Sequence, residues 1–322
     1  MTRNVPYHVE TTLFTTRRTP TEINRTARVA APMASSPSTE LVRSERRGAT
    51  ALLTLNNPPV NVLSKEVLES LAERLDEAEA DPTVRVVVLA SAAEKAFAAG
   101  ANIREMAPLD PEGARVHGGR GQAVTRQIER STLPVVAAVH GVALGGGCEV
   151  CLACDFVLAS EDAQFGQPEI NLGVMPGWGG TRRLPRRIGI VRARRWILTG
   201  RSVAAREAFE QGFVDRVVSR ADLLPTALAL AEELAAKPPI ALAAAKYALL
   251  NAVDPSIDEG LAYELDLWSR LFATEGQKEG MKAFLEKRPL PPMDRHRWES
   301  KSTGFPWADG TSGASKGKRN KE

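Results

Sequence analysis

The sequence predicts an α/β fold in which a largely parallel sheet is layered with helices. Residues 84–91 and 134–141 are short, almost continuous apolar runs, the composition of strands that are buried on both faces. The segments between such runs carry apolar residues at helical spacing. Strands that alternate with helices are joined by βαβ crossovers, and these crossovers make neighbouring strands parallel.

The first half of the chain contains the expected strands. Residues 49–59 predict a strand and a turn, because an apolar run ends in Asn-Asn-Pro-Pro. A helix then begins at Ser64 and ends at Asp81-Pro82. Residues 155–160 repeat the pattern of a buried strand more weakly. The apolar positions of the helix follow the 3.6-residue period: Val67, Leu68, Leu71, Leu75 and Ala78.

After residue 190 the sequence predicts mainly helices. Gly200 can cap the end of one helix, and SIDE at 256–259 and TEGQ at 274–277 have capping-box spacing. The segment between these two boxes carries a stripe of large apolar residues, which either packs on its own domain or forms a subunit interface. We favour the interface. The stripe consists of Leu261, Leu265, Trp268, Leu271 and Phe272.

The composition is that of a soluble intracellular protein. A chain of 322 residues can bury a large core, and its net charge of +3 gives no sign of a nucleic-acid or membrane partner. The three cysteines lie between 148 and 154, too close for a disulfide framework, and fit a reducing compartment such as the cytoplasm. No apolar run approaches the roughly 20 residues that a membrane-spanning helix needs.

We predict four segments along the chain. Residues 1–40 form a disordered N-terminal extension, 41–230 the α/β core, 231–293 a C-terminal helical region and 294–322 a flexible tail. The extension holds five arginines against three glutamates, so a transit peptide for the mitochondrial matrix is an alternative interpretation. Met33 is an alternative start of the protein.

The stretch GVALGGGCEVCLACD at residues 141–155 indicates a site for an anion or a polarised carbonyl. A predicted strand is followed by Gly145, Gly146 and Gly147 and then by a helix. Backbone N–H groups at the start of a helix have no internal partner. Glycine lets a bulky ligand reach them because it has no Cβ. Close packing of the helix on the sheet explains the three glycines equally well.

A second loop has the same arrangement, since Gly100 and Ala101 lie between a predicted strand and a helix. Two such loops bring two N–H groups to one edge of a sheet, which is what an oxyanion hole requires. Glu149 lies in the first turn of its helix, where the helix dipole favours the charged form, and Glu169 follows twenty residues later. Two carboxylates can divide the work of activating water and moving a proton. Either one alone is more often a surface or capping residue.

Five stretches together closely resemble the enoyl-CoA hydratase/isomerase (crotonase) family. The resemblance runs from about Leu41 to Pro289 in the family's order. It implies a spiral of ββα repeats whose C-terminal helices assemble the chain into trimers or hexamers. It also implies an acyl-CoA thioester substrate and no cofactor, because coenzyme A is part of the substrate. The stretches are KAFAAGANI, HGVALGGGCE, AQFGQPEINLGVMPGWGGTRRLPRRIG, ILTGRSVAAREAFEQGFVDRVV and KEGMKAFLEKR.

The resemblance also implies the roles of individual residues. Ala101 and Gly146 would supply the N–H groups that bind the thioester carbonyl, Glu149 would help water attack Cβ, and Glu169 would deliver a proton to Cα. Isomerases of the family generally keep only the glutamate at the Glu169 position. The presence of both therefore favours a hydratase of fatty acid or related metabolism, which turns trans-2-enoyl-CoA into 3-hydroxyacyl-CoA by reversible syn addition of water. The expected acyl-CoA contacts are Ala99, Ala101, Asn102, Ile103, Arg104, Gly146, Pro176 and Gly177.

Other functions of the same family stay open. Double-bond isomerisation, C–C cleavage and decarboxylation run on this scaffold, and pocket residues decide among them. An RNA-binding relative is a weaker alternative, because of a basic tail and an arginine cluster at 182–187. Asn102 stands where many members have Asp, and it can still cap the following helix. Trp178 either shapes the acyl pocket or packs a loop on a helix.

Two further features have structural explanations. Cys148, Cys151 and Cys154 are spaced like metal ligands, but there is no fourth cysteine and the three spread over about 120° of a helix, so we expect small buried side chains and no metal site. His140 ends a strand, and we expect it to pack there. The arginine cluster forms a solvated face or contacts the phosphates of coenzyme A; it comprises Arg182, Arg183, Arg186 and Arg187.

Overall fold

The computed structural model describes residues 40–251, 256–293 and 305. These residues belong to one of the two units into which the chain divides, Thr39–Glu322. Nearly all of the predicted N-terminal extension, with Met33, and of the predicted tail lie outside the described residues. Within the described ranges, no helix combines the length and the apolar character needed to cross a membrane.

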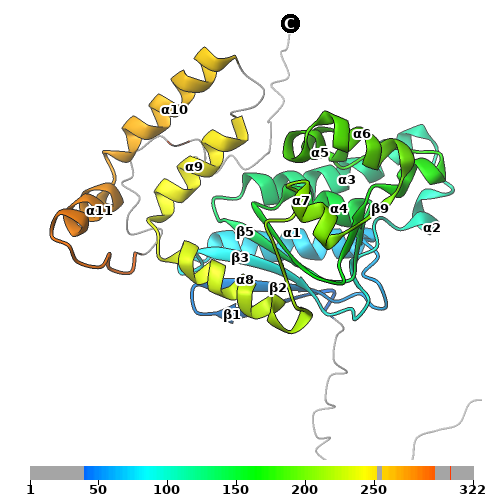
Figure 1. The fold of residues 1–322 in the computed structure, drawn as a ribbon, viewed down its shortest axis with the longest axis horizontal. Helices are drawn as coiled ribbons and strands as arrows, with labels where there is room; N and C mark the ends of the chain where they lie inside the picture. Colours follow the sequence, from blue (N-terminus) through cyan, green and yellow to red (C-terminus); the bar gives the residue numbers. More distant parts are fainter. Residues whose placement is uncertain (1–39, 252–255, 294–304, 306–322) are drawn as a thin grey trace, which may run out of the picture. The chain divides into compact units, whose positions relative to one another are not determined.

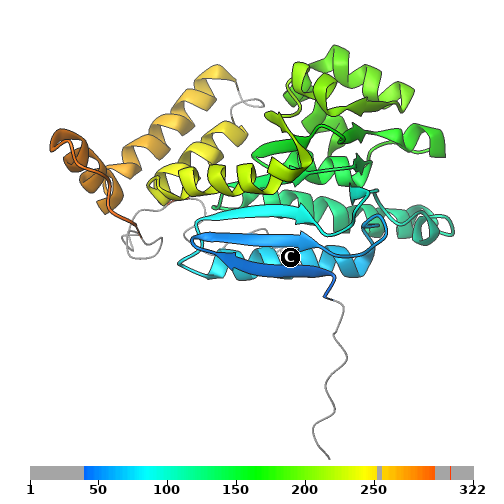
Figure 2. The same ribbon diagram turned by 60° about the horizontal axis from the view of Figure 1, so that its bottom comes forward.

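A six-stranded sheet forms the base of the fold (Figures 1 and 2). The strand order is β1-β2-β3-β5-β7-β10. Only β1 is antiparallel to its neighbour, and every other pair in this sheet is parallel, as the crossover pattern predicts. The strands are β1 (Val42–Arg47), β2 (Thr50–Leu55), β3 (Val86–Ser91), β5 (Val135–Val139), β7 (Phe156–Ser160) and β10 (Arg216–Val218).

A second sheet consists of four strands of three residues each, in the order β4-β6-β8-β9. The strands β4, β6 and β8 run parallel, and β9 is antiparallel to β8. Each of these three parallel strands follows a strand of the larger sheet, so the chain repeats a ββα unit and the predicted spiral is confirmed. The strands are β4 (Ala96–Ala98), β6 (Val142–Leu144), β8 (Gln164–Gly166) and β9 (Ser202–Ala204).

Helices follow the strand pairs and then dominate the C-terminal part of the chain (Figure 1). The earlier helices are α1 (Lys65–Ala80), α2 (Ile103–Met106), α3 (Pro111–Arg130), α4 (Gly146–Ala153) and the 3-10 helix η1 (Pro168–Leu172). The later ones are α5 (Gly180–Ile188), α6 (Ile190–Thr199), α7 (Ala205–Glu210), α8 (Arg220–Ala235), α9 (Pro239–Asn251), α10 (Ile257–Leu271) and α11 (Glu275–Leu285).

The central strands β2, β3 and β5 of the larger sheet are buried on both faces, and the successive side chains of each strand point to opposite faces. On β3, Val86 and Val88 pack with the apolar face of α8, whereas Val87 and Leu89 join the core that α1, α3 and α4 cover. Each fully buried aliphatic side chain of this kind contributes about 1.5–3 kcal/mol. Strands that are apolar on both faces therefore allow helices to pack on each side of the sheet.

The first predicted helix is confirmed in detail. Ser64 is the N-cap of α1, and its side chain accepts a hydrogen bond from Val67 N over 3.4 Å. The five apolar positions predicted for this helix are its buried residues. The strand β1 was not predicted, because five of its six residues are exposed and its sequence is VRSERR.

The C-terminal helices are tied to the core by Lys246 of α9. Its Nζ donates to Asp155 Oδ2 at 2.7 Å and to the carbonyl oxygens of Leu133 at 3.0 Å and Ile128 at 3.2 Å. Ser256 and Glu259 form the predicted capping box of α10, and the Thr274 side chain caps α11. The helix α8 spans the boundary that we placed between residues 230 and 231.

Most of the predicted apolar stripe on α10 is not covered by the described residues. The exposed members are Leu261, Leu265, Trp268 and Phe272, whereas Leu271 packs against a small cluster around Ile240 and Leu267. The exposed rings of Trp268 and Phe272 contact each other edge to face, with centroids 4.6 Å apart. Four large apolar side chains thus remain on the surface of this helix.

Candidate active site

The two glycine loops lie side by side. They follow β4 and β6, which are parallel neighbours paired at Ala98 and Ala143. Gly100 has a φ of +97°, and a Cβ placed on it would lie 2.9 Å from Leu144 O and 3.5 Å from Gly146 N. The loop that carries Ala101 and the start of α4 therefore meet at one edge of the smaller sheet, as the sequence predicts.

Both candidate amides are free of backbone partners. In the part of the chain that the structure describes, neither Ala101 N nor Gly146 N donates to a backbone carbonyl. Gly146 is the first residue of α4, where an N–H group has no acceptor within the helix. The neighbouring N–H groups are used: Gly145 N donates to Gly166 O over 3.0 Å, and Ala99 N donates to Val60 O over 3.0 Å.

Each of the three consecutive glycines lacks a side chain for a different reason. Gly145 has a φ of +52°, and a Cβ there would lie 3.2 Å from Oε1 of Glu169. A Cβ on Gly146 would lie 2.4 Å from the indole of Trp178, and one on Gly147 would lie 2.2 Å from Ala98 O. Close packing of α4 on β4 therefore explains Gly147, whereas Gly145 and Gly146 leave room for the side chains of Glu169 and Trp178.

Glu149 is a buried carboxylate held by backbone amides. The residue is 2% exposed, and its Oε1 accepts hydrogen bonds from Trp178 N at 2.7 Å and Gly180 N at 2.8 Å. Burial raises the pKa of Glu149, and the two amides and the nearby Arg183 oppose this shift. We expected the helix dipole to favour the charged form, but the loss of hydration outweighs it.

Glu169 lies over both glycine loops. Its Oε1 approaches Gly145, because a Cβ on Gly145 would lie 3.2 Å from this oxygen and 4.0 Å from the Cα of Gly100. Burial, with a smaller contribution from the charge of Glu149, raises the pKa of Glu169 to about 7. This glutamate therefore exchanges its proton close to neutral pH, which suits a group that gives and takes protons.

Gln167 lies beside Glu169, and its sequence position alone did not identify it. The residue is fully buried. With its amide nitrogen turned towards Glu169, it donates to Oε1 at 2.9 Å and to Oε2 at 3.2 Å. A Cβ on Gly180 would lie 3.0 Å from the Gln167 amide and 3.1 Å from Oε1 of Glu149. Its position two residues before Glu169 was the only available signal.

The loop that binds Glu149 is anchored to α3 and α5. Thr125 Oγ1 donates to Trp178 O over 3.0 Å, and Gln122 Nε2 donates to Gly177 O over 2.8 Å. Arg183 Nη1 also donates to Trp178 O, at 2.9 Å. The remaining Arg183 nitrogens form two bonds to the Glu129 carboxylate, at 2.9 and 2.7 Å.

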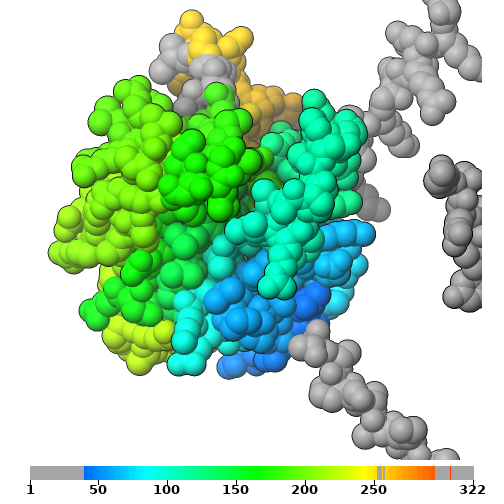
Figure 3. All heavy atoms as spheres, turned by 90° about the vertical axis from the view of Figure 1, so that its right-hand side faces the viewer, coloured from blue at the N-terminus to red at the C-terminus, as the bar shows by residue number. Residues whose placement is uncertain are grey.

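The expected acyl-CoA contacts lie in the loop after β4 and the start of α2, at the start of α4 and in the loop before α5. Figure 3 shows one side of the molecule, with the teal part of the chain beside the green part. Asn102 caps α2, accepting from Arg104 N over 3.1 Å, as an Asp would. Ile103, Arg104 and Gly177 are exposed, Pro176 is buried, and Ala99, Ala101 and Asn102 are half-buried.

The remaining candidate residues have structural partners. Cys148, Cys151 and Cys154 are buried free thiols whose pKa values are raised by burial, as expected for small core side chains. His140 Nε2 lies 2.8 Å from Ala93 O. Arg187 bonds to Phe213 O and Asp215, so neither it nor Arg183 is a free cation for phosphate. Within the described ranges, no group of three or more His, Cys, Asp or Glu side chains is arranged to hold a metal ion.

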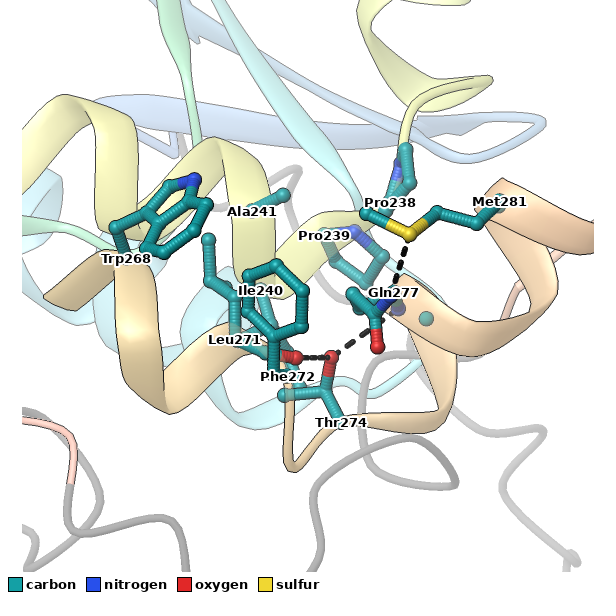
Figure 4. Close-up of a pocket in the computed structure, with 12 residues that line it drawn as sticks. Pro238, Pro239, Ile240, Ala241, Trp268, Leu271, Phe272, Thr274, Gln277 and Met281 are labelled. Carbon is teal, nitrogen blue, oxygen red and sulfur yellow. Dashed lines mark hydrogen bonds between the residues drawn. The ribbon is translucent and has the colours of Figure 1, made fainter. Parts of the chain in front are cut away.

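A separate apolar groove of about 270 Å³ lies among the C-terminal helices, away from the two glutamates. Figure 4 shows Trp268 and Phe272 of the α10 end near Pro239 and Ile240 of α9, with Met281 of α11 on the other side. None of the candidate catalytic residues lines it. We assign it no catalytic role.

Comparison with known proteins agrees with the geometry. The family model for enoyl-CoA hydratase/isomerase matches residues 45–295. A short-chain-enoyl-CoA hydratase of Clostridium acetobutylicum is 40% identical over 247 residues, 76% of this chain and 95% of that protein. A crotonyl-CoA hydratase of Syntrophomonas wolfei is 41% identical over 245 residues, 76% of this chain and 94% of that protein. The crystal structure of an enoyl-CoA hydratase from Bacillus anthracis has a TM-score of 0.75 at 38% identity, and the match covers 79% of this chain and 99% of that one. By sequence and by fold, the chain belongs to the enoyl-CoA hydratase/isomerase family.

Proposed function

We propose that this protein is an enoyl-CoA hydratase, a hydro-lyase that adds water reversibly and in a syn sense to trans-2-enoyl-CoA. The observation that carries the proposal is the grouping of Glu149 and Glu169 next to two loops whose candidate amides have no backbone acceptor among the described residues. The two curated relatives described above are named as hydratases, which supports the same reaction over the others of the family.

The amides of Ala101 and Gly146 would bind the thioester oxygen. Negative charge grows on this oxygen as the double bond is attacked, so two fixed donors stabilise the enolate more than the substrate. Each donor of this kind contributes a factor of about 10²–10³ to the rate. Gly146 has no side chain of its own to stand between a ligand and its amide.

The two glutamates would then divide the proton transfers. Oε1 of Glu149 is already held by two amides, which leaves Oε2 to orient water and accept its proton during attack at Cβ. Glu169, with a pKa of about 7, is protonated in a large fraction of molecules at neutral pH and delivers the proton to Cα. In this proposal both acids act from one side of the double bond, which makes the addition syn.

The reaction forms a Cβ–O bond and a Cα–H bond from water with no overall oxidation or reduction, so the proposal calls for no metal or redox cofactor. Coenzyme A enters as part of the substrate. The buried free thiols fit a reducing compartment, and a cytoplasmic location stays a prediction.

The test is the loss of conjugated thioester absorbance when the protein is mixed with crotonyl-CoA. We expect turnover by the wild type and almost none by a Glu149→Gln/Glu169→Gln double variant. A wild-type rate no higher than that of the double variant would reject the proposal. The isomerase alternative makes a different prediction, since an isomerase would convert a 3-enoyl-CoA to the 2-enoyl isomer and keep this activity in Glu149→Gln.

We further propose that the chain assembles into a trimer or hexamer through its C-terminal helices. The exposed stripe on α10 and the groove beside Trp268 are apolar and belong to the same helices, so a second copy of the chain would cover both. Light scattering should give the mass of three or six chains. Trp268→Lys should lower that mass, whereas Glu264→Lys, at an exposed polar position of the same helix, should not.

A further inference from the structure

His117 carries a buried nitrogen without a partner. The residue lies on α3 and is 8% exposed. No hydrogen bond reaches its Nε2 from any protein group in the described ranges, and solvent does not reach this atom. Leaving a polar atom unpaired in this way costs about 1–3 kcal/mol, whereas an apolar side chain of similar size would avoid the cost. The nitrogen therefore needs an explanation other than packing.

The imidazole of His117 lies beside Trp178. The two ring centroids are 6.3 Å apart, and the ring planes are tilted by 43°. Gly121 follows one turn along the same face of α3, and a Cβ there would lie 2.1 Å from the Trp178 indole. His117 thus extends the side of α3 that faces the indole.

The Trp178 indole also covers the proposed carbonyl site. A Cβ on Gly146 would overlap its six-membered ring, 2.4 Å from the nearest atom. An acyl chain whose carbonyl binds the Gly146 amide consequently starts at this indole. The indole thus contacts Gly146 of α4 and the face of α3 that carries Gly121 and His117, so it links the proposed carbonyl site to His117.

We propose that His117 Nε2 hydrogen-bonds an oxygen at the far end of the acyl chain. The preferred substrates are then short 2-enoyl-CoA thioesters that end in a hydroxyl or a carboxylate. A neutral imidazole can donate from one nitrogen and accept at the other, so Nε2 can pair with either group. This inference rests on the proposed hydratase function, and it adds the class of substrate.

The test compares three six-carbon 2-enoyl-CoA substrates that differ only at the terminal carbon: methyl, hydroxyl and carboxylate. We expect the wild type to show a kcat/KM about tenfold or more higher for at least one oxygen-bearing substrate than for the methyl one, because the methyl end leaves Nε2 unpaired. The two polar substrates distinguish a hydroxyl partner from a carboxylate partner. His117→Phe should lower the polar-to-methyl ratio about 10- to 100-fold.

Two matched variants separate hydrogen bonding from shape. His117→Gln keeps a hydrogen-bonding group and should retain part of the preference. Val116→Phe introduces the same ring at the neighbouring, half-exposed position and should leave the ratio unchanged. If His117→Phe fails to fold, the polar-to-methyl ratio of kcat/KM in the wild type alone tests the inference.

Equal kcat/KM values for the three substrates in the wild type, or an unchanged ratio in folded His117→Phe, would overturn the inference. In that case turnover of crotonyl-CoA would still support the hydratase proposal. Absence of crotonyl-CoA turnover would instead count against the hydratase itself.

Discussion

The backbone N–H of Trp178 donates a 2.7 Å hydrogen bond to Oε1 of Glu149. The indole of the same residue lies against Gly146, which starts the helix that carries Glu149. One residue therefore positions the buried acid through its backbone and limits the space above a candidate oxyanion amide through its side chain.

Replacement of either glutamate by glutamine should separate catalysis from folding. In Glu149→Gln the side-chain oxygen can still accept from Trp178 and Gly180, but the base is gone, so kcat with crotonyl-CoA should fall by about 10²–10⁴. The Tm should not fall, because burial of the charge at Glu149 is unfavourable. Glu161→Gln, at an exposed acid, is the control for steady-state kinetics and melting. A loss in Glu149→Gln of less than tenfold contradicts the assigned role.

The pKa of Glu169, about 7, predicts that catalysis of hydration declines at alkaline pH. Hydration needs the protonated acid, so its kcat/KM should fall about tenfold per pH unit above 7. Water addition takes up no net proton, so its equilibrium constant does not vary with pH, and kcat/KM for dehydration should follow the same profile. Initial rates of hydration from pH 5 to 9 check this. A kcat/KM that stays level from pH 7 to 9 would show that another group controls the proton.

The same pKa predicts how stability depends on pH. Burial raises the pKa of Glu169 from 4.5 to about 7, so the folded protein binds this proton more tightly than the unfolded chain. The contribution is present below pH 4.5 and is lost as the pH rises through 7. Glu169→Gln should therefore melt higher than the wild type at pH 8, and the difference should shrink at pH 4.5. A difference that does not vary with pH contradicts the burial of this acid.

Close contact between Trp178 and α3 predicts opposite effects of alanine at two glycines of that helix. In Gly121→Ala the new methyl would overlap the indole, so we expect a destabilisation of about 1–3 kcal/mol. Trp178→Leu should relieve most of it in the double variant. Gly119→Ala meets no atom within 4 Å and should stabilise the helix by about 0.5–1 kcal/mol. Denaturant unfolding of the four variants measures these effects, and equal effects at the two glycines would contradict the packing.

Arg183 should act on catalysis by positioning the loop that binds Glu149. Arg183→Met removes the bond to Trp178 O and the two bonds to Glu129, and we expect kcat to fall more than KM changes, with about 2–3 kcal/mol of lost stability. Glu129→Gln keeps the bond to Trp178 and should lose less kcat. Equal losses of kcat in the two variants would contradict this role, because they would show that only the Arg183–Glu129 ion pair matters and not the bond to Trp178 O.

Sequence patterns were sufficient for the family, the parallel sheet and the grouping of the two glycine loops. Long apolar runs such as β3 and β5 must be buried as strands of one sheet. Because these strands are parallel, the loops that follow their carboxyl ends lie at the same edge of the sheet. The strand β1 was not predicted because its side chains are mostly exposed and polar. It is held in the sheet by backbone pairing with β2, which leaves no apolar pattern in the sequence. The strands of the smaller sheet have three residues each, too few to show an alternating pattern.

The contacts that tune the acids could not be predicted, because they join distant parts of the chain. The position of Glu149 in the first helical turn predicted that its charged form is favoured. In the structure its carboxylate binds amides 29 and 31 residues away, and burial raises its pKa. Arg183 looked like a surface cation, but its partner Glu129 is 54 residues distant. Burial is a property of the assembled fold and is not visible in a local pattern.

The most direct test of the account is the reaction of crotonyl-CoA in water labelled with ¹⁸O, followed by mass spectrometry of the thioester. The account predicts that the wild type produces 3-hydroxybutyryl-CoA with one labelled oxygen at Cβ, and that the Glu149→Gln/Glu169→Gln variant leaves the substrate unlabelled. Unlabelled product, or the same labelling by both proteins, would contradict it.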